Sequence, residues 1–117
     1  MSNLKQIIVL RTDLKMRRGK EIAQGAHASM KATLENMDDP HVVTWLAGPF
    51  AKIAVGIDGE KALLELYEAA RQEGVVAALI QDAGRTEFKG IATFTAAAIG
   101  PGDPEIIARL TGHLKLR

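Results

Sequence analysis

The residues of this sequence that could do chemistry lie in two polar loops, each of which follows an apolar run. The first loop spans residues 12–20 and ends in Lys20, and the second spans residues 81–88 and contains Asp82 and Thr86. In an open α/β sheet, sites form beyond the carboxyl ends of the strands. Brought together there, the three side chains could orient water and offset negative charge at an ester carbonyl. The alternative for Asp82 is structural, as the acceptor of a turn or cap hydrogen bond.

Basic residues are concentrated in the first loop. Residues 11–20 hold five basic side chains against the single acid Asp13, a net charge of +4 in a chain of formal net charge +1. Positive side chains at the start of a helix oppose its dipole, at a cost of about 0.3–1 kcal/mol per charge, and a bound phosphate would turn this cost into attraction. The segment therefore predicts an anionic partner. The five basic residues are Arg11, Lys15, Arg17, Arg18 and Lys20.

A helical period follows the first loop and predicts a helix over residues 19–37. Two sets of side chains fall on different sides of this helix, and we expect the apolar set to face the core. The polar set forms one stripe within about 60°, for which a solvated face is the ordinary alternative. The apolar set is Ile22, Ala26, Met30, Thr33 and Met37. The polar set is Lys20, Gln24, His27 and Lys31.

Several other chemistries find no support in the sequence. The chain has no cysteine, and its three histidines are not spaced as metal ligands, so we expect neither a metal nor a cofactor. Ser29 lies in a predicted helix without a GxSxG context, which argues against a covalent serine mechanism. Gly19 and Lys20 resemble the end of a phosphate loop, but Leu14 and Glu21 occupy positions where that motif needs glycine and serine or threonine.

The elements that must position these residues alternate along the chain. Apolar runs predict strands over residues 6–12, 53–57, 75–80 and 91–99. Caps predict three further helices: Asp39 with Pro40 begins one, Asp58 begins the next, which ends at Gly74, and Asp103 begins the last. In the short second helix we expect Val42, Val43 and Leu46 to be buried. This order predicts a single α/β domain over residues 1–117, with a four-stranded mixed, mostly parallel sheet and helices on both faces.

Length and composition agree with a small globular protein. The chain has 117 residues, of which 47% are hydrophobic and 25% are charged, a balance that favours one folded core. No apolar run approaches the roughly 20 residues that span a bilayer, and the N-terminus lacks a signal-peptide pattern. We therefore expect a cytoplasmic protein that does not bind membranes.

The two loops and several other segments closely resemble the peptidyl-tRNA hydrolases of the type shared by archaea and eukaryotes. The resemblance covers nearly the whole chain, in the right order, and only residues 39–50 match less well. Gly25 is a departure, because many relatives carry cysteine or a larger residue there. The matching segments are RTDLKMRRGK (11–20), AQGAHAS (23–29), DAGRTEF (82–88), TFTAAAIGP (93–101) and TGHLKL (111–116).

The resemblance implies a mixed four-stranded sheet, a homodimer, and metal-free hydrolysis of the ester between a peptide and the terminal ribose of tRNA. It implies catalytic roles for Lys20, Asp82 and Thr86, with His27 and Arg85 close enough to contact the substrate.

We expect three basic residues of the first loop, Lys15, Arg17 and Arg18, to bind tRNA as well. Two other hypotheses remain. A non-catalytic RNA-binding module would use the same basic loop but would not need a carboxylate opposite Lys20. A scaffold protein would bind partners through apolar surface, which the aromatic content of 4% does not favour.

Overall fold

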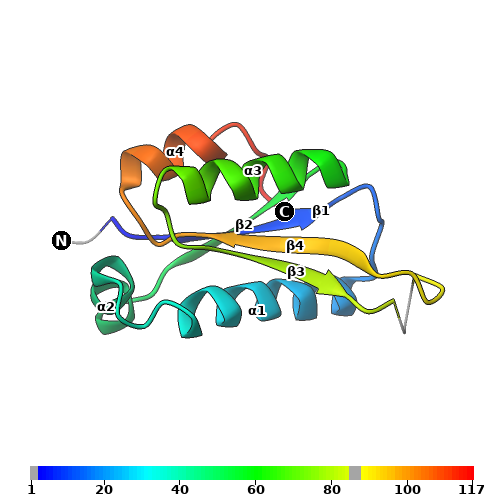
Figure 1. The fold of residues 1–117 in the computed structure, drawn as a ribbon, viewed down its shortest axis with the longest axis horizontal. Helices are drawn as coiled ribbons and strands as arrows, with labels where there is room; N and C mark the ends of the chain where they lie inside the picture. The colour runs from blue at the N-terminus through cyan, green and yellow to red at the C-terminus, as the bar shows by residue number, and fades with distance from the viewer. Residues whose placement is uncertain (1–2, 85–87) are drawn as a thin grey trace.

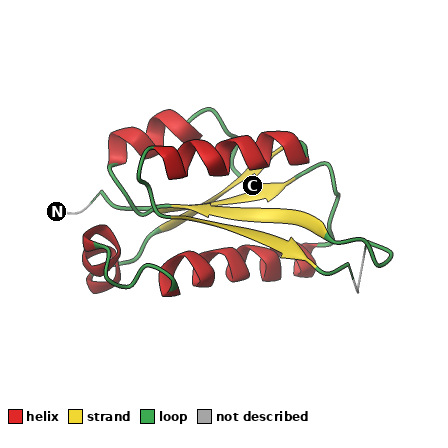
Figure 2. Cartoon of the chain, viewed as in Figure 1, coloured by secondary structure: helices red, strands yellow, loops and turns green. Residues whose placement is uncertain are grey.

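Four strands form one sheet that has helices on both faces, as Figures 1 and 2 show. The computed structural model describes residues 3–84 and 88–117. Helices α1 and α2 lie on one face of the sheet, and α3 and α4 lie on the other. Within the described ranges, no helix is both long and apolar enough to cross a membrane. The elements are β1 (Gln6–Arg11), α1 (Arg18–Leu34), α2 (Pro40–Ala47), β2 (Lys52–Ile57), α3 (Glu60–Gln72), β3 (Ala77–Asp82), β4 (Thr93–Ile99) and α4 (Pro104–Thr111).

The strand order is β2-β1-β4-β3, which confirms the predicted mixed four-stranded sheet, although most of its strand pairs are antiparallel and not parallel as expected. Only β1 and β2 pair in parallel, because β4 runs antiparallel to both of its neighbours. The segment between β3 and β4 is too short for the crossover that parallel neighbours require. Strands β1, β2 and β3 nevertheless point in the same direction (Figure 1), so the loops after β1 and β3 meet at one end of the sheet.

Most of the predicted helix boundaries are confirmed by the hydrogen bonds that cap them. The carboxylates of Asp39 and Asp103 accept hydrogen bonds from backbone N–H groups in the first turns of α2 and α4. Gly74 follows α3 with a φ of +74°, the left-handed conformation expected of it. The predicted cap Asp58 is wrong: the residue before α3 is Gly59, whose own backbone, at φ +100°, leads into the helix without a side-chain cap.

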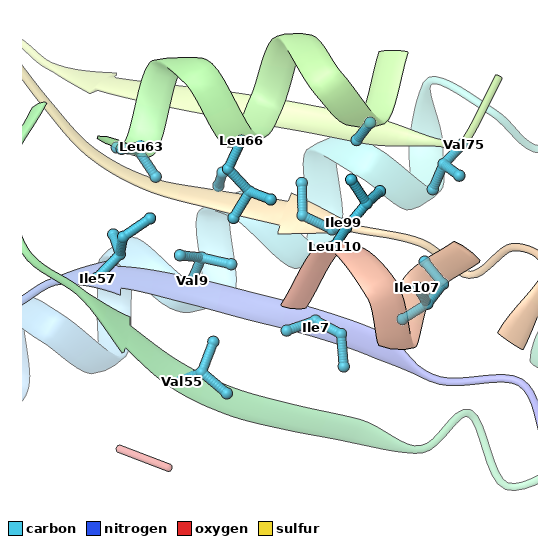
Figure 3. Close-up of a cluster of buried hydrophobic side chains, with 12 residues drawn as sticks. Ile7, Val9, Val55, Ile57, Leu63, Leu66, Val75, Ile99, Ile107 and Leu110 are labelled. Atoms are coloured by element: carbon cyan, nitrogen blue, oxygen red, sulfur yellow. The ribbon is translucent and has the colours of Figure 1, made fainter. Parts of the chain in front are cut away.

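The face beneath α3 and α4 holds a core of large aliphatic side chains, which Figure 3 shows. Leu63 and Leu66 of α3 are buried as predicted, and they pack with residues of β1, β2 and β4. The strand residues that point to this side alternate with those that point to the other, as a pleated sheet requires. The labelled core residues are Ile7, Val9, Val55, Ile57, Leu63, Leu66, Val75, Ile99, Ile107 and Leu110.

The face beneath α1 is packed differently, and the predicted buried side of α1 is wrong. Ile22 and Met30 are 65% and 60% exposed. Small and polar residues face the sheet instead, so the helix lies close to it: a Cβ on Gly25 would lie only 3.2 Å from Ile8 Cγ2. Large side chains at these positions would hold the helix away from the sheet. The residues that α1 buries are Gln24, Gly25, Ala28, Ser29 and Ala32.

Helix α2 also buries a different set from the one expected. Val42 is buried, but Val43 is 53% exposed and Leu46 is 37% exposed. Trp45 takes their place in the core, and its indole N–H donates to the carbonyl of Ala51 at 2.9 Å. This bond ties the short helix to the segment that enters β2.

Candidate active site

Lys20 and Asp82 join the two polar loops across the sheet end. Lys20 Nζ donates to Asp82 Oδ1 at 2.7 Å, although the residues are 62 positions apart in the chain. Each side chain is only 14% exposed. The pleat of β3 explains the direction of Asp82: Ala78 and Ile80 pack beneath α1, so the next even-numbered residue points to the same helix.

The Asp82 carboxylate is held at both oxygens. Its Oδ2 accepts from the backbone N–H of Gly84 at 2.8 Å. The hydrogen bond from Lys20 lowers the pKa of Asp82 most, burial opposes this, and Gly84 and the charges of Lys20 and His27 lower it further. The turn needs glycine, because Gly84 has a φ of +82° and a Cβ there would collide with the backbone of Ile91. Because its pKa is lowered, Asp82 stays ionised at neutral pH.

The Lys20 ammonium also lies over an aromatic ring from the second loop. Its Nζ is 5.6 Å from the centre of the Phe88 ring, within the range of a cation–π interaction. The ring and the carboxylate hold the positive charge in a partly buried place, where water screens it less than at the surface. A cation fixed in this way can stabilise negative charge that develops on a bound ester.

Two buried side chains, Gln24 and Thr95, lie beside this pair and were not predicted as site residues. Gln24 follows Lys20 by one helical turn and is 4% exposed, and Thr95 of β4 is fully buried. The Thr95 hydroxyl donates to the amide oxygen of Gln24, which fixes the orientation of that amide. The hydrogen bond therefore ties α1 to β4 one helical turn after Lys20.

A β-bulge delivers Thr95 to this position. The register between β3 and β4 shifts at Ile80 and Gln81, whose partners are Ala96 and Phe94, so Thr95 is the extra residue. Strict alternation from Ala96 would point Thr95 at α3, away from Gln24. A sequence pattern cannot show which residue of a strand is skipped, and Thr95 was therefore not predicted as a site residue.

The other predicted site residues lie around the pair or beyond the described residues. His27 is exposed on α1, near enough for its charge to affect Asp82. Lys15, Arg17 and Arg18 are exposed where the first loop enters α1, and Arg18 lines a hollow on the opposite side of the helix from Lys20. Thr86 and Arg85 fall outside the residues that the structure describes. In the described part of the chain, no three His, Cys, Asp or Glu side chains gather as a metal site.

Comparison with known proteins agrees with the chemistry of this site. The family model described as "Peptidyl-tRNA hydrolase PTH2" matches residues 4–117. A peptidyl-tRNA hydrolase from Methanocaldococcus jannaschii is 43% identical over 115 residues, which cover 97% of this chain and 99% of the relative. Peptidyl-tRNA hydrolases from Haloquadratum walsbyi and Methanothermobacter thermautotrophicus are 41% and 37% identical over 113 residues, with the same two coverages.

Proposed function

The chain belongs to the PTH2 family of peptidyl-tRNA hydrolases, and we propose that Lys20 and Asp82 form the centre of its active site. As a peptidyl-tRNA hydrolase it cleaves the ester between a peptide and the 3′-terminal ribose of tRNA, which returns tRNA to translation. The observation that carries the proposal for the site is the 2.7 Å contact between Lys20 Nζ and Asp82 Oδ1, which joins the two polar loops.

Lys20 supplies positive charge to the reacting ester. When water attacks the ester carbonyl carbon, the carbonyl oxygen becomes an oxyanion, and an ammonium already in place stabilises it without reorganisation. Asp82 keeps the ammonium in place, supported by the Gly84 N–H. Its lowered pKa makes the carboxylate a weak base near neutral pH, so we assign Asp82 to holding Lys20 and orienting water. We propose that Thr86 contributes its hydroxyl to the same water.

The charge of the site favours peptidyl over aminoacyl esters. An aminoacyl-tRNA carries a free α-amino group, which is largely protonated at neutral pH because its usual pKa is about 7.7–8.0. That ammonium would be attached to the carbon next to the ester carbonyl, near Lys20, and the two like charges would repel. In a peptidyl-tRNA the same nitrogen is an uncharged amide, so the repulsion is absent.

The exposed basic residues before and within the first turn of α1 would bind tRNA phosphates. Lys15, Arg17 and Arg18 surround the positive end of the α1 dipole, where phosphate is favoured. His27 and Arg85 are candidates for further substrate contacts. Binding through phosphates releases counterions, so tRNA affinity should fall steeply with salt, and replacing Arg17 with alanine should lower the salt slope by about 1.

We propose that the protein is a cytoplasmic homodimer. Translation supplies its substrate in the cytoplasm, and the family resemblance implies a dimer. Support for an interface comes from the outer side of α1, where Ile22, Met30 and Leu34 are more than half exposed beside a hollow of about 940 Å³. Light scattering would show the mass of two chains, and Met30→Glu should reduce it to one. A single-chain mass for the unmodified protein would contradict the dimer.

One assay tests the proposed function. The enzyme is mixed with an N-acetylated aminoacyl-tRNA and with the same aminoacyl-tRNA carrying a free amine, each with and without a chelator. We expect cleavage of the acetylated substrate that the chelator does not change, and much slower cleavage of the free amine. Binding without cleavage of either substrate would instead support an RNA-binding module.

A further inference from the structure

The two outer edges of the sheet, β2 and β3, differ in their backbone hydrogen bonds. At the β2 edge, the C-terminal segment adds backbone hydrogen bonds to the strand. The N–H of Gly56 donates to the carbonyl of Lys115, and the N–H of Arg117 donates to that of Ala54, both at 2.9 Å. The chain thus covers this edge itself, as soluble proteins often do with exposed strands.

The β3 edge has no such cover among residues 3–84 and 88–117. Its one hydrogen bond in those ranges comes from a side chain: Lys31 Nζ donates to the carbonyl of Leu79 at 3.2 Å, in an exposed position. The carbonyl of Val76 accepts from the N–H of Gly100, just after β4, so Val76 faces β4 and the Leu79 carbonyl, three residues later, points away from the β3–β4 ladder. In an antiparallel ladder the N–H and carbonyl of one residue point the same way, and alternate residues share that direction. Ala77, Leu79 and Gln81 therefore direct their backbone groups outward.

This open edge leads to the active site. Strand β3 ends at Asp82, and an extended chain of five residues alongside it would cover about 16 Å, back to Ala77. The polar stripe of α1 also leads from Asp82 back along β3, because Lys20 contacts Asp82 and Lys31 contacts the carbonyl of Leu79. A chain held at Lys20 and Asp82 would therefore next meet the outward backbone groups of β3, among which the Leu79 carbonyl is bonded by the exposed side chain of Lys31.

We propose that the peptide part of the substrate pairs with the open edge of β3 as a fifth strand. The inference rests on the proposed function, because it places the ester at Lys20 and Asp82. The ester is at the carboxyl end of the peptide, so the peptide runs parallel to β3. Main-chain hydrogen bonds recognise a peptide whatever its side chains, which suits an enzyme whose substrates carry peptides of any sequence. There are two competing interpretations. Lys31 could serve only to prevent other chains from pairing with β3, or a second copy of this chain could pair with β3.

A substrate series tests the pairing without altering the enzyme. One tRNA carries N-acetylated peptides of one to six residues with the same ester-linked residue, and kcat/KM is measured for each. We expect kcat/KM to rise up to about five residues, the length of the edge. In the five-residue substrate, methylating every second amide nitrogen should lower kcat/KM by about 2- to 10-fold per lost hydrogen bond, and methylating the amides between should have little effect.

The outcomes separate the inference from the function on which it rests. Cleavage of every substrate at one rate, whatever its length or methylation, would overturn the pairing and leave the proposed function intact. A length advantage that fades as enzyme concentration rises would assign the edge to a second copy and would also overturn it. If no substrate of the series is cleaved, the proposed function fails and the inference fails with it.

A pair of variants locates the pairing on β3. Leu79→Pro removes the outward N–H, which an edge strand tolerates, and Leu79→Ala shortens the side chain but keeps the N–H. We expect both variants to cleave the N-acetylated aminoacyl-tRNA alike, and only the proline variant to lose the advantage of longer peptides. Equal length profiles for the two variants would overturn the assignment to β3. If the proline variant does not fold, the methylation series decides.

Discussion

The two faces of the sheet are packed with different kinds of side chain. Beneath α3 and α4, large aliphatic side chains such as Leu63 and Ile99 fill the core. Beneath α1, most of the buried apolar residues are alanines, and buried polar side chains, among them Gln24 and Thr95, form hydrogen bonds between helix and sheet. The first face can only stabilise the fold, whereas the second also holds the charged pair at its end. Stability and chemistry are therefore divided between the two faces, and substitutions on each face should have separable effects.

The largest loss of stability is expected on the aliphatic face. Leu63 is fully buried, and Leu63→Ala should lower the free energy of unfolding by about 2–5 kcal/mol, through lost burial and the cavity left behind. Because none of the site residues that the structure describes belongs to the core on that face, cleavage per folded molecule should stay near the unmodified rate. Denaturant titration and single-turnover cleavage measure the two quantities. A large loss of rate in the folded variant would break the division between the faces.

The largest loss of rate is expected at Lys20. Lys20→Ala removes the ammonium from the ester, and the rate of cleavage should fall about 10²- to 10³-fold, as for a lost oxyanion donor. Stability should also decrease slightly, since Asp82 loses its partner in a place only 14% exposed. Lys61→Ala, an exposed lysine of α3, is the matched control and should be neutral in both. Normal cleavage by Lys20→Ala would end its catalytic assignment.

A smaller effect on both quantities is expected at Thr95. Thr95→Val keeps the shape but leaves the amide oxygen of Gln24 buried without its donor, which should cost about 1–3 kcal/mol of stability. The rate of cleavage should fall because the helix turn that carries Lys20 is less firmly held. It should fall less than for Lys20→Ala, because the ammonium is still present. Thr111→Val removes a buried hydroxyl on α4 and is the control for the other face. Equal effects of the two valine variants on cleavage would contradict a positioning role for Thr95.

The last prediction is that the contribution of Asp82 to cleavage does not change between pH 7 and 5. The pKa of Asp82 is lower in the folded protein than in the unfolded chain, whose usual value is about 3.9. The stabilisation from this group is therefore complete above the unfolded pKa and is lost only as pH falls through the lowered one. The ratio of cleavage rates of the unmodified enzyme and Asp82→Asn should then be constant from pH 7 to 5. A ratio that approaches one below pH 6 would mean that Asp82 titrates there.

The sequence predicted one face of the molecule well and the other poorly, for a physical reason. Periodicity finds a helix face when large apolar residues face the core, as Leu63 and Leu66 of α3 do. On α1 the rule fails, because Gly25 and small neighbours are buried while Ile22 and Met30 are exposed. The loop motifs still singled out Lys20 and Asp82 as candidate site residues, and the structure brings these two side chains into contact.

What the sequence could not supply is the three-dimensional support of that pair. The bulge that turns Thr95 toward Gln24 depends on how two strands pair, and the residue pattern of either strand alone does not predict that pairing. The antiparallel direction of β4 was missed although its cause is visible in the sequence, because the segment between Asp82 and Thr93 is too short for a crossover connection.

A double-mutant cycle on cleavage tests most directly whether Lys20 and Asp82 act as one unit. Single-turnover rates are measured for the unmodified enzyme, Lys20→Ala, Asp82→Asn and the double variant, with folding checked for each. If Asp82 acts by holding Lys20, its substitution should slow the unmodified enzyme strongly but change little once Lys20 is gone. An equal loss from Asp82→Asn in both backgrounds would show that the two side chains work independently and would contradict the active site described for this chain.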